Sequence, residues 1–393
     1  MTPSARVQAA IELLDEIIGA ARSGGAAADT LIARYFKTRR YAGSKDRRAV
    51  RDLVYRGVRA FGDVPVSGRA AMLGLAAQDE ALLGAFTGPP HGPLPATTDE
   101  AAARHSLLPA WLGPLLDPLV GQEELPALLA RAPLDLRVNR LRATREQALA
   151  MFPEAEPTPR APLGLRLPEG HPVDASQPWL EGLVEVQDEG SQLLAAACGA
   201  RAGELVVDLC AGAGGKTLAL AADMADQGRL VASDTDRSRL SRMRPRLERA
   251  GVSVVEPRLL DPKREAAALA DLAGAADLVL VDAPCSGSGT WRRNPETRWR
   301  LNRDRLDQLL ALQSRLLDLA EPLLKPGGRL VYAVCSLLAA EGRDQAAAFT
   351  GRSALRPQAV PLTAGRAAGT GRLLTPAADG TDGFFVACWQ RPC

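Results

Sequence analysis

Two cysteines follow short apolar runs that are typical of buried strands. Cys285 lies in LVLVDAPCSGSGT, and Cys335 lies in RLVYAVCSLL. Parallel strands present their carboxyl ends at one edge of a sheet, so the two thiols are expected to face one pocket if their strands are neighbours. Asp282 ends the first of these runs, three residues before Cys285, and adds a carboxyl group to the same edge.

This combination suits chemistry at an unreactive pyrimidine carbon. A thiolate that adds to carbon 6 of cytosine makes carbon 5 enamine-like, so that carbon 5 can accept a methyl group from a sulfonium. A base then removes the carbon-5 proton and the thiol leaves. Asp282 would remain protonated or would accept from the exocyclic amine. The spacing leaves open which thiol attacks, and inert burial is the commonest fate of a cysteine. We expect that fate for Cys198, Cys210, Cys388 and Cys393.

A glycine-rich loop, VVDLCAGAGGKT, follows one predicted strand and opens a helix. Its glycines let a ligand approach the backbone closely. The loop matches neither a P-loop nor the GxGxxG dinucleotide fingerprint. Asp234, at the end of the next strand, is placed to accept from ribose hydroxyls, or else caps a helix. Asp261, after a third strand, is either an adenine-side contact or a turn residue.

Composition and charge add two candidate surfaces for nucleic acid. The chain has 393 residues and a net charge of only +2, but the stretch 34–59 holds ten Lys or Arg against two acids. That stretch is either a phosphate-tracking patch or a solvated helix face. The segment TWRRNPETRWRLNRDR interleaves arginines with Trp291 and Trp299. It either stacks on single-stranded RNA or packs its tryptophans into the core.

Six scattered cysteines and three histidines predict no metal site. No apolar run approaches the roughly 18 residues of a membrane span, and no leader is recognisable, so we expect reduced thiols in a cytoplasmic enzyme.

The patterning predicts an α/β chain with a helical N-terminal part. Residues 1–86 carry helical periodicity, 87–98 form a Pro- and Gly-rich loop, and helical signals return at 112–132. Residues 134–141 alternate like a strand, and Thr144 caps a short helix. From residue 186, apolar strands alternate with helices, which indicates a parallel sheet covered on both faces.

At these residues the chain resembles the RsmB/Sun family of RNA cytosine-5 methyltransferases. DLCAGAGGKT, DAPCSGSG with RRNPETRWR, and LLKPGGRLVYAVCSLL are similar to the family's motifs, and VQDEGSQL resembles the start of its catalytic domain. Gly212-Ala213 stands where Ala-Pro is common. After CSLL the family usually has Pro-Glu-Glu-Asn, and this chain has Ala339-Ala340-Glu341-Gly342, of which only Glu341 matches.

The resemblance implies a role for each matching residue. Cys335 would be the nucleophile, Cys285 would assist product release, Asp282 would contact cytosine and cofactor, and Lys216 would act beside them. S-adenosylmethionine would be bound by Cys210, Ala211, Gly212, Ala213, Gly214, Gly215, Lys216, Asp234, Arg237, Asp261 and Asp282.

The resemblance also implies the domains and the substrate. We expect an all-α NusB-like RNA-binding domain at 1–125, an RRM-like α/β module at 126–185, and a class I, Rossmann-like methyltransferase domain at 186–393. The expected substrate is 16S ribosomal RNA, bound by a monomer without metal or membrane. The alternatives are the same chemistry on transfer RNA, or a non-catalytic RNA-binding assembly factor.

Overall fold

The computed structural model describes residues 1–88 and 90–393, which form two compact units. The helical unit comprises Met1–Leu116 and Trp291–Arg303. The sheet unit comprises Asp117–Thr290 and Asp304–Cys393. The division therefore gives a late segment of the chain to the N-terminal unit. The domain boundaries expected near residues 125 and 185 stay predictions.

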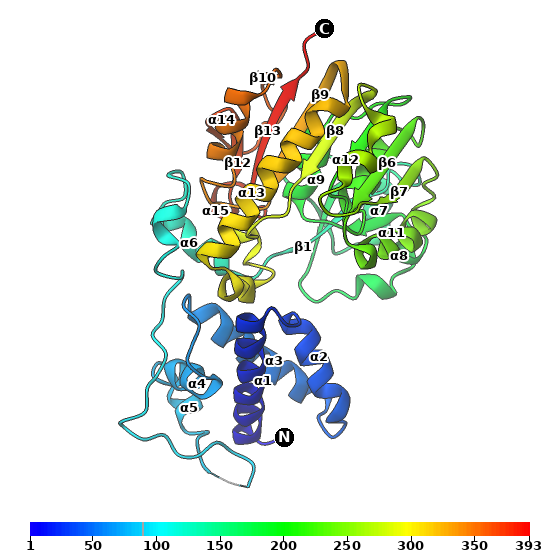
Figure 1. The fold of residues 1–393 in the computed structure, drawn as a ribbon. Helices are drawn as coiled ribbons and strands as arrows, with labels where there is room; N and C mark the ends of the chain where they lie inside the picture. The colour runs from blue at the N-terminus through cyan, green and yellow to red at the C-terminus, as the bar shows by residue number, and fades with distance from the viewer. Residues whose placement is uncertain (89) are drawn as a thin grey trace. The chain divides into compact units, whose positions relative to one another are not determined.

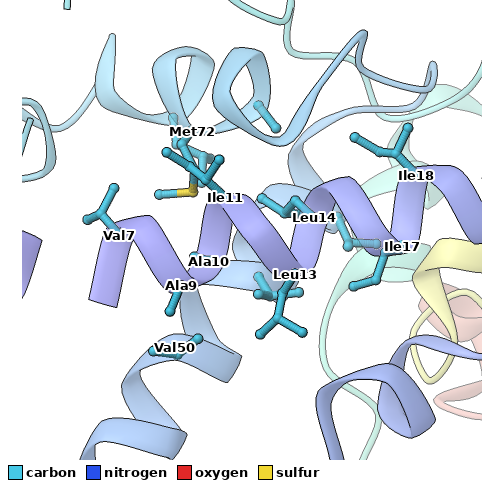
Figure 2. Close-up of a cluster of buried hydrophobic side chains, with 14 of the residues drawn as sticks. Val7, Ala9, Ala10, Ile11, Leu13, Leu14, Ile17, Ile18, Val50 and Met72 are labelled. Atoms are coloured by element: carbon cyan, nitrogen blue, oxygen red, sulfur yellow. The ribbon is translucent and has the colours of Figure 1, made fainter. Parts of the chain in front are cut away.

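The helical unit is built around its first helix. The residues at helical spacing, Val7, Leu14 and Ile18, are buried there, as the periodicity predicts (Figure 2). Thr2 caps this helix, because its hydroxyl accepts from the Ala5 backbone N–H at 3.1 Å. The helices are α1 (Pro3–Ser23), α2 (Ala28–Thr38), α3 (Ser44–Ala60), α4 (Gly68–Ala76) and α5 (Glu80–Leu83).

The segment Trp291–Arg303 completes the core of the helical unit. Trp299 is 5% exposed, lies in this core, and its indole N–H donates to the Phe61 carbonyl at 2.8 Å. Trp291 is fully buried. The prediction that these tryptophans stack on RNA is therefore wrong, and the alternative, burial in the core, is correct.

Arg298 ties this segment to the carboxyl end of α3. Its guanidinium, 1% exposed, donates to the carbonyls of Val58, Arg59 (2.9 Å) and Phe61 (3.1 Å). A cation at a helix C-terminus satisfies its free carbonyls and complements the helix dipole. Burial lowers the pKa of Arg298 to about 10, which leaves it charged at neutral pH.

We expect Arg298→Ala to lower the free energy of unfolding of the helical unit by about 3 kcal/mol. The variant leaves several buried carbonyls without a donor, and each such group carries a desolvation penalty. Urea denaturation followed by circular dichroism measures the loss. Arg303→Ala, at an exposed position in the same segment, serves as the control and should change stability by less than about 0.5 kcal/mol. Equal effects in the two variants would contradict the capping role.

The sheet unit begins with a small antiparallel sheet. Its strands β2 (Glu156–Pro157), β3 (Gly164–Leu167), β1 (Leu134–Val138) and β4 (Val184–Val186) lie in that order. The strand predicted at 134–141 is confirmed by β1. Thr144 and Gln147 form a capping box at the start of α7 (Arg145–Met151), as predicted.

The helical signals at 112–132 correspond to three short helical pieces. Pro114 and Pro126 lie in the first turns of two of them, where a missing backbone N–H is tolerated, and Pro118 lies between the first two pieces. The pieces are η1 (Gly113–Leu115), η2 (Gln122–Glu124) and α6 (Leu125–Leu129).

The large sheet has the order β11-β12-β13-β9-β8-β5-β6-β7, with β10 paired to β13. The five strands β7, β6, β5, β8 and β9 are parallel, whereas β13 is antiparallel to β9. The strands are β5 (Leu205–Asp208), β6 (Arg229–Asp234), β7 (Val255–Leu259), β8 (Ala276–Asp282), β9 (Leu324–Val334), β10 (Arg356–Gln358), β11 (Arg366–Ala368), β12 (Gly371–Leu374) and β13 (Phe384–Gln390).

Helices cover both faces of this sheet (Figure 1). The remaining α-helices are α8 (Gln177–Leu180), which packs against β4 of the small sheet, and α9 (Glu189–Ala197), α10 (Gly215–Asp223), α11 (Arg237–Ala250), α12 (Glu265–Ala268), α13 (Arg303–Ala320), α14 (Arg343–Arg352) and α15 (Pro376–Asp379). The predicted Rossmann-like α/β fold is confirmed. The strand order reverses between β5 and β8, the position at which such sheets bind ligands. Among the described residues, no helix has the length and apolar character needed to cross a membrane.

Candidate active site at the carboxyl edge of the sheet

Acids and thiols stand where the parallel strands end. Asp208, Asp234 and Asp282 are the last residues of β5, β6 and β8, and Cys335 directly follows β9. Because these strands run in the same direction, the four side chains share one edge of the sheet. The parallel strands thus place acids and thiols at the point between β5 and β8 where the strand order reverses.

The two thiols lie together. Strands β8 and β9 are hydrogen-bonded neighbours with Asp282 opposite Ala333, so the loops that follow them start side by side. The Sγ atoms of Cys285 and Cys335 are 3.3 Å apart, and both side chains are partly exposed. Thus the sequence expectation, which depended on the strands being adjacent, agrees with the geometry.

The surroundings keep Cys285 protonated. The hydrogen bond with Cys335, burial, and the nearby charges of Cys335 and Glu341 raise the pKa of the Cys285 thiol well above its usual value. A protonated Cys285 can donate its S–H to the sulfur of Cys335.

Lys216 and Asp282 form an ion pair beside the thiols. The Nζ and Oδ2 atoms are 2.7 Å apart. Burial opposes the charge on Lys216, but the Asp282 carboxylate and the charge of Cys335 outweigh it, so the pKa of Lys216 is raised. The ammonium lies 5.6 Å from the centre of the Phe384 ring. A fixed cation near a cysteine favours the thiolate, which is the reactive form.

The glycine-rich loop leaves room for a ligand. Gly212 has a φ of 58°, and a Cβ placed there would meet nothing within 4 Å. Its N–H donates to Asp234 Oδ2 at 2.9 Å, so the acid at the end of β6 holds the loop. Helix α10 begins at Gly215 and turns its N-terminus toward this edge. Three features lie together here: free space beside the Gly212 backbone, the Asp234 carboxyl group and the N-terminus of α10. This combination fits a nucleoside cofactor.

Gly214 has a different constraint from Gly212. Its φ is 86°, and an added Cβ would lie 2.7 Å from Cγ of Met243 on α11. We expect Gly214→Ala to destabilise the fold by about 2–3 kcal/mol, because the residue is strained and overpacked. Gly212→Ala has the strain without the clash and should cost only about 1 kcal/mol. Thermal unfolding of both variants measures the difference, and equal losses would show that packing on Met243 is unimportant.

Two expected cofactor residues are placed less tightly. The Leu260 N–H donates to the Asp234 carbonyl at 2.9 Å, which places the backbone just before Asp261 next to Asp234, but the Asp261 side chain is 70% exposed. Arg237 is the exposed first residue of α11. A different arginine on that helix contacts the loop, since Arg246 donates to the Ala213 carbonyl at 2.7 Å. No sequence pattern distinguishes Arg246 from the other arginines on α11.

Asp208 is a further site residue that sequence reasoning did not single out. It accepts from the Thr217 hydroxyl at 2.7 Å and is 1% exposed. Burial, partly offset by this hydrogen bond, raises the pKa of Asp208 to about 7, with the charge of Asp282 contributing. Its other oxygen, Oδ1, has no partner among the described residues. A buried carboxyl group at the end of the central strand thus stands next to the glycine-rich loop.

Comparisons with known proteins agree with this geometry. The family model described as 16S rRNA methyltransferase RsmB/F matches residues 195–390. The ribosomal RNA small subunit methyltransferase B of Salmonella typhi is 38% identical over 291 residues. That match covers 72% of this chain and 66% of the relative, which is slightly less than two thirds of its length.

Solved structures resemble the whole chain and its larger part. The crystal structure of PH0851 matches with a TM-score of 0.75 and 25% identity, and covers 100% of this chain and 99% of that one. A methyltransferase homologue from Pyrococcus horikoshii matches with a TM-score of 0.60 and 28% identity, over 68% of this chain and 89% of its own.

Proposed function

Because the chain belongs to the RsmB/F family of 16S rRNA methyltransferases, we propose that it is an S-adenosylmethionine-dependent RNA (cytosine-5)-methyltransferase. The observation that supports this most is the pair of thiols 3.3 Å apart at the ends of adjacent strands. One thiol suffices for nucleophilic catalysis, whereas a reaction that must also reverse the covalent bond benefits from a second acid/base group.

In this proposal Cys335 is the nucleophile and attacks carbon 6 of the cytosine. The Lys216 ammonium, which is paired with Asp282, lies beside it, and the Asp282 carboxyl contacts the base near N3 and the amino group. After methylation at carbon 5, the carbon-5 proton is removed, the electrons of that C–H bond form the carbon 5–carbon 6 double bond, and the Cys335 sulfur leaves carbon 6. Cys285 assists by donating its proton to the departing sulfur, which lies within hydrogen-bond distance, and the Cys285 thiolate formed in this way accepts the carbon-5 proton.

The loop Cys210–Lys216 with Asp234, Asp261, Arg237 and Asp282 forms the proposed binding site for S-adenosylmethionine. This cofactor supplies an electrophilic methyl group when bound. Asp234 accepts from the ribose hydroxyls with lone pairs that its bonds to the Gly212 and Asp236 N–H groups leave free. Asp261 approaches the adenine side. The free space beside Gly212 admits the ligand close to the backbone.

The proposed substrate is small-subunit ribosomal RNA. The relative from Salmonella typhi is named a ribosomal RNA small subunit methyltransferase, which supports the same class of RNA as the substrate here. The target cytosine must be unpaired or flipped to reach the thiols at the strand ends. The helical unit, with its cation-rich stretch 34–59, is the proposed RNA-binding domain. The need for reduced thiols supports a cytoplasmic location.

The first test is transfer of a radiolabelled methyl group from S-adenosylmethionine to purified RNA classes. We expect label in free 16S ribosomal RNA and its mapping to 5-methylcytosine by bisulfite sequencing. Label in transfer RNA would keep the chemistry and change the substrate. No labelled cytosine in any RNA would contradict the proposal and favour a non-catalytic assembly factor.

A further inference from the structure

One buried carboxylate joins the two cysteine-bearing loops. Glu341 is fully buried, and it follows Cys335 by six residues. On the first loop, its Oε1 accepts from the Ser286 N–H at 2.8 Å, and Oε2 accepts from the Ser286 hydroxyl. On the second loop, Oε2 also accepts from the Ser336 hydroxyl at 2.6 Å. Ser286 and Ser336 are the residues directly after Cys285 and Cys335.

Further hydrogen bonds make this connection rigid. Gln313, on α13, donates through Nε2 both to Glu341 Oε1 and to the Pro284 carbonyl, each at 3.0 Å. The Tyr332 hydroxyl donates to the Glu341 carbonyl at 2.7 Å. The Ser288 and Ser336 hydroxyls are 3.0 Å apart. Buried carboxylates are costly unless their oxygens are satisfied, and here both oxygens are.

We propose that Glu341 is the positioning residue that sets the separation of the Cys285 and Cys335 thiols. The proposal rests on the function proposed above. In that mechanism Glu341 contacts neither the substrate nor the cofactor, so its role is to position the two thiols. Strands β8 and β9 bring only the starts of the two loops together. Beyond the strand ends, Glu341 and the two serines it binds connect the loops. Two backbone groups add to this connection: the Gly289 N–H donates to the Cys335 carbonyl at 3.0 Å, and the Leu337 N–H donates to the Ser288 hydroxyl at 2.9 Å.

Each cysteine is followed by a serine that binds the same carboxylate. Ser286 and Ser336 both donate their hydroxyls to Glu341, while the thiols of the preceding residues, Cys285 and Cys335, lie 3.3 Å apart. Without the Glu341 carboxylate, the Ser286 and Ser336 hydroxyls, the Ser286 N–H and the Gln313 side chain each lose an acceptor. The two loops then lose the side chain that binds both of them.

The test compares Glu341→Ala and Glu341→Gln by two independent measurements. The first is bridging of Cys285 and Cys335 by dibromobimane, a short dithiol reagent that fluoresces when both ends have reacted. The second is steady-state methylation of 16S ribosomal RNA. We expect Glu341→Ala to lose most of the bridging and about 100-fold in kcat, with KM for RNA nearly unchanged, because misplaced reacting groups affect turnover rather than binding. Glu341→Gln keeps one acceptor oxygen and should recover part of both signals.

A matched control separates positioning from general destabilisation. Asp379 is also a buried carboxylate of the sheet unit, and it accepts from the Gly365 and Thr375 N–H groups at 2.9 and 3.0 Å. Asp379→Ala should lose stability but keep dithiol bridging and kcat per folded molecule. If Glu341→Ala retains wild-type bridging, or loses bridging only as much as Asp379→Ala, the proposal is wrong.

The two measurements also distinguish this proposal from the proposed function. If wild-type protein methylates no RNA but Glu341→Ala alone loses bridging, the positioning role holds and the assigned reaction fails. If wild-type protein methylates RNA and Glu341→Ala keeps full kcat, the reaction holds and the positioning role fails.

Discussion

Cys335→Ala is expected to reduce methyl transfer by at least about 10⁴-fold, because the proposed mechanism assigns to Cys335 the sulfur that adds to carbon 6 of the pyrimidine. The Lys216–Asp282 pair would remain, but it only supports the charge of a nucleophile and cannot replace one. Single-turnover transfer of labelled methyl to 16S ribosomal RNA measures the loss. Binding of S-adenosylmethionine should be retained, since the glycine-rich loop is untouched.

Cys198→Ala is the matched control for this experiment. Cys198 is a buried thiol of the same unit, 2% exposed at the end of α9, and burial raises its pKa well above the usual value. Its removal should leave the rate per folded molecule within about threefold of wild type, as expected for a thiol with only a packing role. A Cys335→Ala variant that remains as active as Cys198→Ala would refute the assigned nucleophile.

Cys285→Ala is expected to accumulate a covalent complex between protein and RNA. Without the second thiol, Cys335 would still attack and the methyl group would still be transferred, but release of the sulfur would become slow. Turnover should fall by about 10²–10⁴-fold, which is the usual contribution of a positioned acid or base. Denaturing electrophoresis with labelled RNA detects the complex as a band of reduced mobility.

The double variant Cys285→Ala, Cys335→Ala supplies the control, because it lacks the attacking sulfur and should form no complex. A complex formed by Cys335→Ala but not by Cys285→Ala would reverse the roles of the two thiols. The 3.3 Å separation is compatible with either direction of proton transfer, and only the trapped species identifies the attacking atom.

The sequence predicted which chemically reactive side chains share one edge of the sheet. Asp234 and Asp282 end apolar strands, Cys335 and Cys285 follow such strands, and the rule that parallel strands end at one edge places all four together. This reasoning needs only local patterning and a known topology. It therefore recovered the fold class and the proximity of the thiols.

Residues that act across long stretches of sequence could not be predicted in this way. Glu341 was visible only as the single match in a divergent stretch, because its partners come from separate loops and from α13. Arg298 and Trp299 were ambiguous for a related reason. An arginine next to a tryptophan suits RNA or a core equally, and the carbonyls that decide the matter lie about 240 residues earlier in the chain. Local composition contains no information about such distant acceptors.

The place of Trp299 in the helical core also determines when that core can finish forming during protein synthesis. The helices α1 to α5 emerge from the ribosome early, yet the carbonyls of Val58 and Phe61 obtain their donors only after about three quarters of the chain has been made. Until then the nascent N-terminal helices expose an incomplete apolar surface. The strands β5 to β8 and the Cys285 loop emerge before the segment that closes the N-terminal core. Folding of the two units is consequently interleaved in time, and the N-terminal helices cannot mature first as an independent domain.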